Sequence, residues 1–270
     1  MPDLLAEIFA AKARRLEAEM AHEPLPGLRA QAGRRIAERR SLLRALTTPP
    51  VPRLIAEMKR ASPSAGVLAE ALDPGSAAAL YQAGGAVAIS VLTEADHFQG
   101  HLADLEQARS GTRLPVLRKD FLTTPYQVVQ SAAHGADAVL AIVAGLTDGQ
   151  LRAILSQARE FELDVLVEVH DLVELGRALN LDCPLIGVNN RDLRTLEVDL
   201  NRTERLARQV PSSRVLVSES GLTSPADIHR LQDSGVSCFL VGEALLRDPD
   251  PVAWLTAARA RPTTVAPGSP

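Results

Sequence analysis

The sequence predicts an α/β fold, a closed (β/α)8 TIM barrel with an N-terminal helical extension. From residue 53 onward, short apolar runs typical of strands alternate with helical patterns, which indicates a parallel sheet. Eight such units fit into about 210 residues, which suits a closed barrel better than an open doubly wound sheet. No GxGxxG motif opens the first unit, which weakens the alternative of a dinucleotide-binding fold.

The residues ahead of the barrel are expected to form two helices. Apolar residues recur at helical spacing over 3–21, residues 24–27 interrupt the pattern with two prolines and a glycine, and a second helical stretch spans 28–46. The arginine pairs at 34–35 and 39–40 are expected on solvated helix faces.

The barrel elements follow from the apolar runs and from helix-start patterns. Asp73-Pro74, Thr124-Pro125 and Ser224-Pro225 each place a capping side chain before a proline in the first helical turn. We expect strands at 53–58, 86–91, 114–118, 137–142, 164–169, 185–189, 214–218 and 237–241. We expect helices at 74–83, 101–109, 125–134, 148–161, 171–180, 202–209, 224–234 and 250–260. The domains are then a helical extension packed on the barrel (1–50), the catalytic barrel (51–262) and a flexible tail (263–270).

Composition excludes several classes of function. The formal charge of −4 does not give the basic surface that nucleic-acid binding requires. No apolar run approaches the roughly 18 residues of a membrane span, and no signal peptide is evident. The two cysteines, Cys183 and Cys238, are far apart, which favours a reducing, cytoplasmic location. The histidines do not group, so no metal site is expected.

Charged residues end four of the strands, where a barrel carries its catalytic groups. Side chains alternate along a strand, so Lys119 should point inward with Leu117, and Glu168 with Leu166. Each polar run alone could be a solvated turn, but a carboxylate inside a buried strand is costly without partners. Several such clusters at one rim favour proton-transfer chemistry. The inward groups at this rim are expected to be Glu57, Lys59, Lys119, Glu168, Asn189, Arg191 and Glu219, with Ser220 beside them.

A phosphate site is indicated by glycines after the last two strands. Ser220-Gly221 and Gly242-Glu243 follow these strands, and barrels often bind phosphate between the two corresponding loops. The carboxylate of Glu243 should point away from such an anion. The loop over 62–66 adds hydroxyl groups and a glycine, and it could be either a mobile lid or an ordinary turn.

The motifs together resemble the indole-3-glycerol phosphate synthase family of tryptophan biosynthesis, and the resemblance runs through the whole barrel. The stretches that carry it are IAEMKRASPSAG (55–66), ISVLTEADHFQG (89–100), LPVLRKDFLTTPYQV (114–128), GADAVLAI (135–142), VLVEVHDLVEL (165–175), IGVNNRDLRTLEVDL (186–200), VLVSESGL (215–222) and FLVGEALLRDPDP (239–251). RKDF, NNRDL and SESG in this order are highly specific.

The resemblance implies a carboxy-lyase that closes the ring of 1-(o-carboxyphenylamino)-1-deoxyribulose 5-phosphate with loss of CO2 and water. By similarity, Lys119 is the general acid, Glu168 is the general base or proton relay, and Glu57 assists the leaving hydroxyl. The substrate-binding residues would be Lys59, Ser62, Pro63, Phe98, Phe121, Leu140, Asn189, Arg191, Glu219, Ser220, Gly221, Leu240, Gly242 and Glu243. No metal or other cofactor is implied, and the enzyme is expected to be a monomer or weak homo-oligomer that binds a small phosphorylated substrate, without nucleic acid or membrane.

Three positions depart from the family pattern without touching the proposed acid or base. Ala65 stands where a lysine is frequent, His101 where a serine is common, and Ala244 where a serine is frequent. The alternatives are another phosphosugar barrel, such as a phosphoribosylanthranilate isomerase or a ribulose-phosphate epimerase, and a non-catalytic barrel that binds a phosphorylated metabolite. The former would lack the RKDF and NNRDL pair, and the latter needs no acid–base groups.

Overall fold

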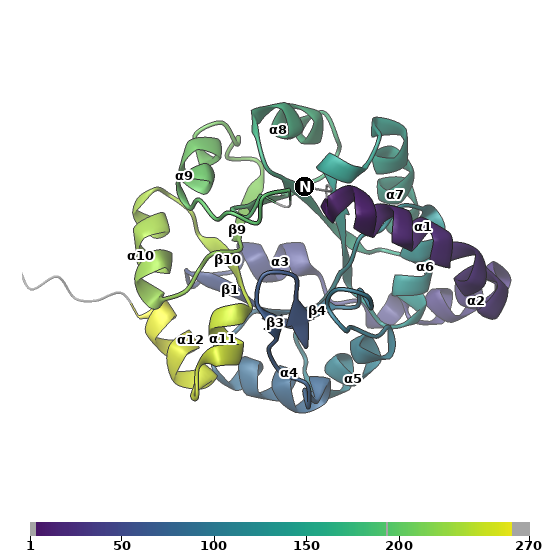
Figure 1. Cartoon of the computed structure of the whole chain (residues 1–270), viewed down its shortest axis with the longest axis horizontal. Coiled ribbons are helices and arrows are strands. Elements are labelled where there is room, and N and C mark those ends of the chain that lie inside the picture. Colours follow the sequence, from purple (N-terminus) through teal and green to yellow (C-terminus); the bar gives the residue numbers. More distant parts are fainter. Residues whose placement is uncertain (1–3, 193, 261–270) are drawn as a thin grey trace, which may run out of the picture.

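Eight parallel strands close into one barrel, as the sequence predicts (Figure 1). The computed structural model describes residues 4–192 and 194–260, so the tail expected over 263–270 lies outside the described residues. Around the barrel the order is β1-β10-β9-β8-β7-β6-β5-β4. The strands are β1 (Arg53–Met58), β4 (Ala88–Leu92), β5 (Val116–Lys119), β6 (Ala138–Ile142), β7 (Asp164–Val169), β8 (Leu185–Asn189), β9 (Val215–Glu219) and β10 (Cys238–Val241).

Helices surround the barrel, as the alternating pattern predicts (Figure 1). They are α4 (Pro74–Ala83), α5 (Ala103–Gly111), α6 (Pro125–Ala133), α7 (Asp148–Glu160), α8 (Leu172–Leu179), α9 (Asn201–Ala207), α10 (Pro225–Asp233) and α12 (Pro251–Arg259). Short elements that the sequence did not predict are the hairpin of β2 (Ala61–Ser62) and β3 (Gly66–Val67) and the 3-10 turn η2 (Val143–Gly145). A short helix, α11 (Glu243–Arg247), follows β10.

Strands β7 and β8 have the predicted bounds, whereas β4 and β5 each begin two residues later than predicted. These two strands were predicted to start too early, because the apolar run in the sequence begins before the first residue of each strand. Pro115, for example, lies in the apolar run but precedes the first residue of β5.

Residues alternate between two cores along each strand. One set points into the barrel and forms a single cluster that includes Ile55, Leu117, Leu166 and Val217. The alternate set packs between the sheet and the surrounding helices. Side chains two positions apart on a strand point to the same side. Polar residues that lie two positions beyond an inward apolar residue therefore point into the mouth of the barrel.

The N-terminal extension differs from its prediction in two respects. Helix α1 (Leu4–His22) is followed directly by α2 (Leu25–Arg34), whose first turn contains the proline and glycine that were expected to lie in the break. The single helix predicted over 28–46 is wrong: the 3-10 turn η1 (Ile36–Glu38) and α3 (Leu42–Thr47) follow α2 separately. Helix α3 buries Leu42 and Leu46 in the inner cluster and closes the amino-terminal end of the barrel.

Two arginines that were expected on a solvated face instead bind the amino-terminal end of the barrel. The guanidinium of Arg39 donates to the carbonyls of Ala132, Ala136 and Phe161 at 2.7–3.2 Å. Arg40 donates to the carbonyls of Thr112 and Leu114 in the same way. Burial lowers the pKa of Arg39 to about 10, with Asp137 opposing the shift. The extension is therefore attached to loop backbone through charged hydrogen bonds, which the sequence pattern did not reveal.

Asp137 connects several of these segments at the start of β6. Its buried carboxylate accepts two hydrogen bonds from Arg109 at 2.7 and 2.8 Å, and one each from the backbone N–H groups of Val116 and Arg40 at 3.0 Å. Removing one partner of a buried ion pair leaves the other charge without compensation.

We therefore expect Asp137→Asn to lower the free energy of unfolding by about 3–5 kcal/mol in chemical denaturation. Asp182→Asn is the matched control. Asp182 forms an ion pair with Arg159, and the two side chains are 90% and 67% exposed, so this substitution should change the free energy of unfolding by less than about 1 kcal/mol. Equal, small losses in both variants would contradict the role given to Asp137.

Candidate active site

All the residues that the sequence analysis named for catalysis or substrate binding line one cavity at the carboxyl ends of the strands. The cavity has a volume of about 540 Å³. It receives side chains from several strand ends and from the loops that follow them, and α1 also contributes Leu4, Leu5 and Ile8 to its wall. The role of each residue toward a substrate remains a prediction, but the strand parity that brought them together is confirmed for Lys119 and Glu168.

Lys119 lies among carboxylates from different strands. Its Nζ is 2.9 Å from Oε2 of Glu168 on β7 and 3.5 Å from Oε2 of Glu219 on β9. Burial alone would lower the pKa of Lys119, but the charges of Glu168, Glu219 and Glu57 outweigh burial and raise it. Lys119 is therefore a firmly protonated ammonium in the resting enzyme.

Glu168 and Glu219 respond to this surrounding in opposite directions. Burial opposes ionisation of Glu168, yet Lys119, His170 and a hydrogen bond from Asn189 at 3.0 Å lower its pKa. For Glu219, burial raises the pKa to about 8, with Lys119 opposing and Glu168 adding to the rise. Both carboxyl oxygens of Glu219 are buried without a hydrogen-bond partner. At neutral pH, Glu168 is thus the carboxylate of this pair and Glu219 retains a proton.

Gly187 on β8 makes the approach of these groups possible. It pairs with Glu168 across the sheet, and a Cβ atom there would lie 2.0 Å from Oε1 of Glu219. The carboxyl group of Glu219 occupies the space that any side chain at position 187 would fill. A glycine inside a strand often marks such a close approach, so the sequence contained this signal, although it was not used.

Glu57 and Lys59 form a second ion pair at the end of β1. Oε1 of Glu57 lies 2.8 Å from Nζ of Lys59, and the Glu57 side chain is 7% exposed. Gly242 packs against this carboxylate, because a Cβ atom at position 242 would be 2.6 Å from Oε1 of Glu57. The sequence analysis expected Gly242 to allow the backbone to approach a bound anion. In the structure, Gly242 also leaves room for the carboxylate of Glu57.

Asn190 shapes the turn after β9. Its side chain donates to the carbonyls of Glu219 and Ser220 at 3.0 and 3.1 Å, and it accepts from the hydroxyl of Thr203 at 2.7 Å. Ser220 and Gly221 take φ values of 65° and 76° in this turn. Within the NNRD motif, Asn189 therefore belongs to the cavity and Asn190 to its support.

The loops after β9 and β10 present backbone to the same part of the cavity. A Cβ atom on Gly221 would lie 2.2 Å from Cγ1 of Val198, so this turn packs tightly against the loop after β8. The carboxylate of Glu243 binds Arg247 at 2.9 Å within α11, and its orientation away from a bound anion stays a prediction. Arg191 donates from Nη1 to the carbonyl of Leu196 at 2.9 Å.

An apolar wall faces the polar cluster. The rings of Phe98 and Phe121 have centroids 6.1 Å apart, and Phe9 of α1 contacts Phe121 edge to face at 5.8 Å. Leu140 and Leu240 line the cavity from β6 and β10. This combination of an apolar wall and a polar cluster is typical of a small-molecule site.

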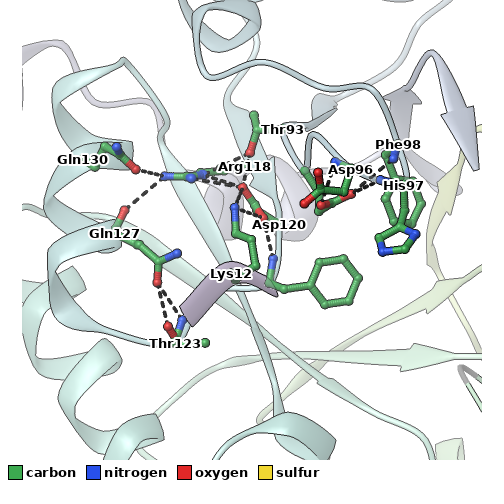
Figure 2. Close-up of polar contacts among 12 residues, drawn as sticks. Lys12, Thr93, Asp96, His97, Phe98, Arg118, Asp120, Thr123, Gln127 and Gln130 are labelled. Atoms are coloured by element: carbon green, nitrogen blue, oxygen red, sulfur yellow. Dashed lines mark hydrogen bonds and ion pairs between the residues drawn. The ribbon is translucent and has the colours of Figure 1, made fainter. Parts of the chain in front are cut away.

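Buried charges behind the wall hold it in place. Arg118 does not line the cavity, whereas Asp120 contributes to its wall beside Lys119, and both Arg118 and Asp120 are almost fully buried. Asp120 binds Nζ of Lys12 at 2.9 Å and Nη2 of Arg118 at 3.0 Å, and it accepts from the hydroxyl of Thr93 at 2.5 Å (Figure 2). Burial would raise the pKa of Asp120, but the two cations lower it well below its usual range. Arg118 and Asp120 are therefore buried and Lys119 is largely so, which excludes the alternative of a solvated turn for this run.

Glu94 orients the segment that carries Phe98. Its carboxylate accepts hydrogen bonds from the backbone N–H groups of Asp96, His97 and Phe98 at 2.7–3.2 Å (Figure 2). Glu94 and His170 are site-supporting residues that the sequence analysis did not single out, because both act through neighbours that are apparent only in the fold.

Neither a metal centre nor a membrane span is found in the part of the chain that the structure describes. Residues 4–192 and 194–260 contain no cluster of three or more His, Cys, Asp or Glu side chains suited to a metal ion. Over the same residues, no helix is long and apolar enough to cross a membrane.

Fold and site together define a TIM-barrel protein that carries a buried cluster of lysine and carboxyl groups in a cavity at its strand ends. The model of one family, indole-3-glycerol phosphate synthase, matches residues 5–257. The chain belongs to this family of carboxy-lyases, whose ring-closing reaction is a step of tryptophan biosynthesis.

Relatives and solved structures agree with this assignment. The indole-3-glycerol phosphate synthase of Albidiferax ferrireducens is 47% identical over 253 residues, which cover 93% of this chain and 96% of the relative. That of Azospirillum brasilense is 54% identical over 197 residues, or 73% and 75% of the two chains. Among solved structures, 3-hexulose-6-phosphate synthase from Salmonella typhimurium has a TM-score of 0.61 at 10% identity, covering 77% of this chain and 96% of that one. A crystal structure of KGPDC from Streptococcus mutans has a TM-score of 0.60 at 14% identity and the same coverage, and both show the shared fold alone.

The raised pKa of Glu219 predicts a pH-dependent effect on stability. Between pH 4.5 and about 8, the unfolded chain has lost the Glu219 proton while the folded chain keeps it, so this group's contribution to stability falls as the pH rises through that window. Glu219→Gln removes this contribution. We compare the free energy of unfolding of Glu219→Gln with that of the unsubstituted enzyme. This difference should shift in favour of the variant by more than about 1 kcal/mol from pH 5 to pH 8, since one pKa unit corresponds to about 1.4 kcal/mol. Denaturant unfolding at several pH values measures this difference, and a difference independent of pH would contradict the assignment.

Proposed function

We propose that the cavity closes the indole ring with Lys119 as general acid and Glu168 as base. The observation that supports this best is the enclosure of the Lys119 ammonium by Glu168 and Glu219 in a cavity with an apolar wall. These groups hold two transferable protons, one on Lys119 and one on Glu219, beside one carboxylate that can accept a proton.

The reaction needs protons at two points. A bond forms between the ring carbon that bears the carboxylate and the ketone carbon, and the ketone oxygen then takes a proton from Lys119 to become a hydroxyl group. The bond to the carboxylate breaks and releases CO2. Loss of water then requires one proton delivered to the hydroxyl and one removed from the adjacent carbon. We assign the removal to Glu168 and the positioning of the leaving hydroxyl to Glu57.

Glu219 makes Lys119 a better acid than its raised pKa alone suggests. An ammonium held by several carboxylates gives up its proton reluctantly. A proton on Glu219 removes one of these negative charges, so the field at Lys119 is weaker than three ionised carboxylates would produce. Glu219 can also return a proton to the cluster after each turnover.

Substrate binding is assigned to the remaining wall of the cavity. The backbone of the turns at Ser220-Gly221 and Gly242-Glu243, with the hydroxyl of Ser62, would hold the phosphate, since these groups line the cavity and the carboxylate of Glu243 is paired with Arg247. Phe98, Phe121, Leu140 and Leu240 would hold the aromatic ring. Arg191, Asn189 and Lys59 would orient the polar chain between the two ends, and Pro63 would complete the wall.

Several properties of the enzyme go with this proposal. We propose that it works in the cytoplasm as a monomer or weak homo-oligomer, without nucleic acid, and that residues 1–50 act as an extension of one catalytic barrel domain. Size-exclusion chromatography with light scattering tests the oligomeric state.

Lys119→Met is expected to lower kcat by about 10²- to 10⁴-fold, the usual loss for a general acid, while the product still binds. Indole fluorescence measures both turnover and product affinity. Lys59→Met is the matched comparison, because it removes the other lysine of the cavity and should raise KM more than it lowers kcat. Retention of more than about half of the rate by Lys119→Met would refute its role as the acid.

Gly221→Ala is expected to raise both KM and the inhibition constant of inorganic phosphate by about tenfold or more, because the new Cβ displaces the turn from Val198. Gly235→Ala is the matched control. Gly235 also has a positive φ, 88°, but a Cβ atom there meets no atom within 4 Å and the residue lies outside the cavity. Equal phosphate inhibition of the enzyme and both variants would exclude this turn as the phosphate site.

A further inference from the structure

We propose that His170 is a positioning residue that holds Glu168 ionised and correctly oriented from behind the cavity. This inference rests on the base role proposed for Glu168. His170 is the residue after β7, and it is two positions beyond Glu168. Side chains two positions apart lie on the same face of a strand, so the imidazole lies above the carboxylate.

The distances support a direct interaction. Nε2 of His170 is 3.6 Å from Oε1 of Glu168, and this ring nitrogen is buried without a hydrogen-bond partner. Oε1 also accepts from Asn189, while Oε2 binds Lys119. Glu168 is therefore surrounded by one amide and two groups that can carry positive charge. A small movement of the carboxylate toward the ring would complete the hydrogen bond.

Glu174 in the first turn of α8 fixes the ring. Its Oε2 accepts from the backbone N–H of His170 at 2.8 Å and lies 3.1 Å from Nδ1. A carboxylate can only accept in this pair, so Nδ1 carries a hydrogen. Asp171 caps the same helix through the backbone N–H groups of Val173 and Glu174, which holds Glu174 in place. The ring plane is thus set by α8, and Nε2 is left directed toward Glu168.

The charges around the ring favour the imidazolium. The groups that face it are Glu168 from β7, Glu174 from α8 and Arg202 from α9. Burial and Arg202 disfavour the charged ring, but the two carboxylates outweigh them, and the pKa of His170 is raised above 6.5. The surroundings therefore favour the charged ring, and that charge is one cause of the lowered pKa of Glu168.

His170 does not line the cavity, although its neighbours Glu168 and Asn189 do. It can therefore act on the reaction only through Glu168. This separates a positioning role from a binding role: loss of His170 should change turnover and its pH dependence while leaving substrate affinity almost unchanged.

The activity test is His170→Asn, which keeps a side-chain donor for Glu174 but cannot be charged. We expect kcat to fall about tenfold or more, KM to change less than twofold, and the acidic limb of the kcat profile to move to higher pH, since Glu168 then takes up a proton more easily. His101→Asn replaces an exposed histidine outside the cavity and should change none of these. An unchanged pH profile in His170→Asn would overturn the inference.

NMR of the imidazole gives a readout that does not depend on activity. The His170 resonance, assigned by through-bond correlation to its backbone in isotope-labelled protein, should titrate with a pKa above 6.5 in the intact enzyme, and this pKa should fall in Glu168→Gln. An equal His170 pKa in both proteins would overturn the inference even if His170→Asn did not fold. If Glu168→Gln retains full turnover, the base role of Glu168 fails, and the NMR titration still decides whether the two side chains interact.

Discussion

The site depends on one ammonium group held among carboxylates that are far apart in sequence. Lys119 interacts with Glu168, Glu219 and Glu57, which come from β7, β9 and β1. All three carboxylates are distant from Lys119 in the sequence and lie on other strands. They come close to Lys119 only because the sheet closes into a barrel. A buried cluster of this kind is costly to assemble, because every charge loses water. The net negative charge of the cluster is reduced where Glu219 retains a proton, so the stability of the barrel depends on the protonation of this group.

Much of this arrangement could be predicted from the sequence, because strand parity is a local property. Lys119 and Glu168 each lie two positions beyond an inward apolar residue, and the structure places both in the cavity as predicted. The barrel itself followed from the alternation of strands and helices, and the motif resemblance supplied the reaction, which the family assignment agrees with.

The features that could not be predicted arise from contacts between distant segments. Gly187 inside a strand indicates that some group approaches closely, but only the fold shows that this group is the carboxyl of Glu219. Arg39 looked solvated because its acceptors are backbone carbonyls, which leave no mark in a sequence. His170 was not singled out, since its partners lie on two different elements, β7 and α8.

The extension contacts the barrel at both of its ends. Helix α3 seals the amino-terminal end with Leu42 and Leu46, while α1 contributes Leu5 and Ile8 to the cavity wall. The buried pair of Lys12 and Asp120 fixes α1 beside Phe121, whose backbone N–H donates to Asp120 at 2.8 Å. The apolar wall of the site therefore depends on a helix that precedes the barrel.

The most direct test of this account is a crystal structure with a substrate analogue in which the ketone is reduced to an alcohol and cannot cyclise. The account predicts that Nζ of Lys119 lies within about 3.2 Å of the alcohol oxygen, a hydrogen-bonding distance. It also predicts that the phosphate contacts the backbone of the turns at Gly221 and Gly242. An alcohol oxygen bound by Lys59 and out of hydrogen-bond reach of Lys119 would contradict the central claim.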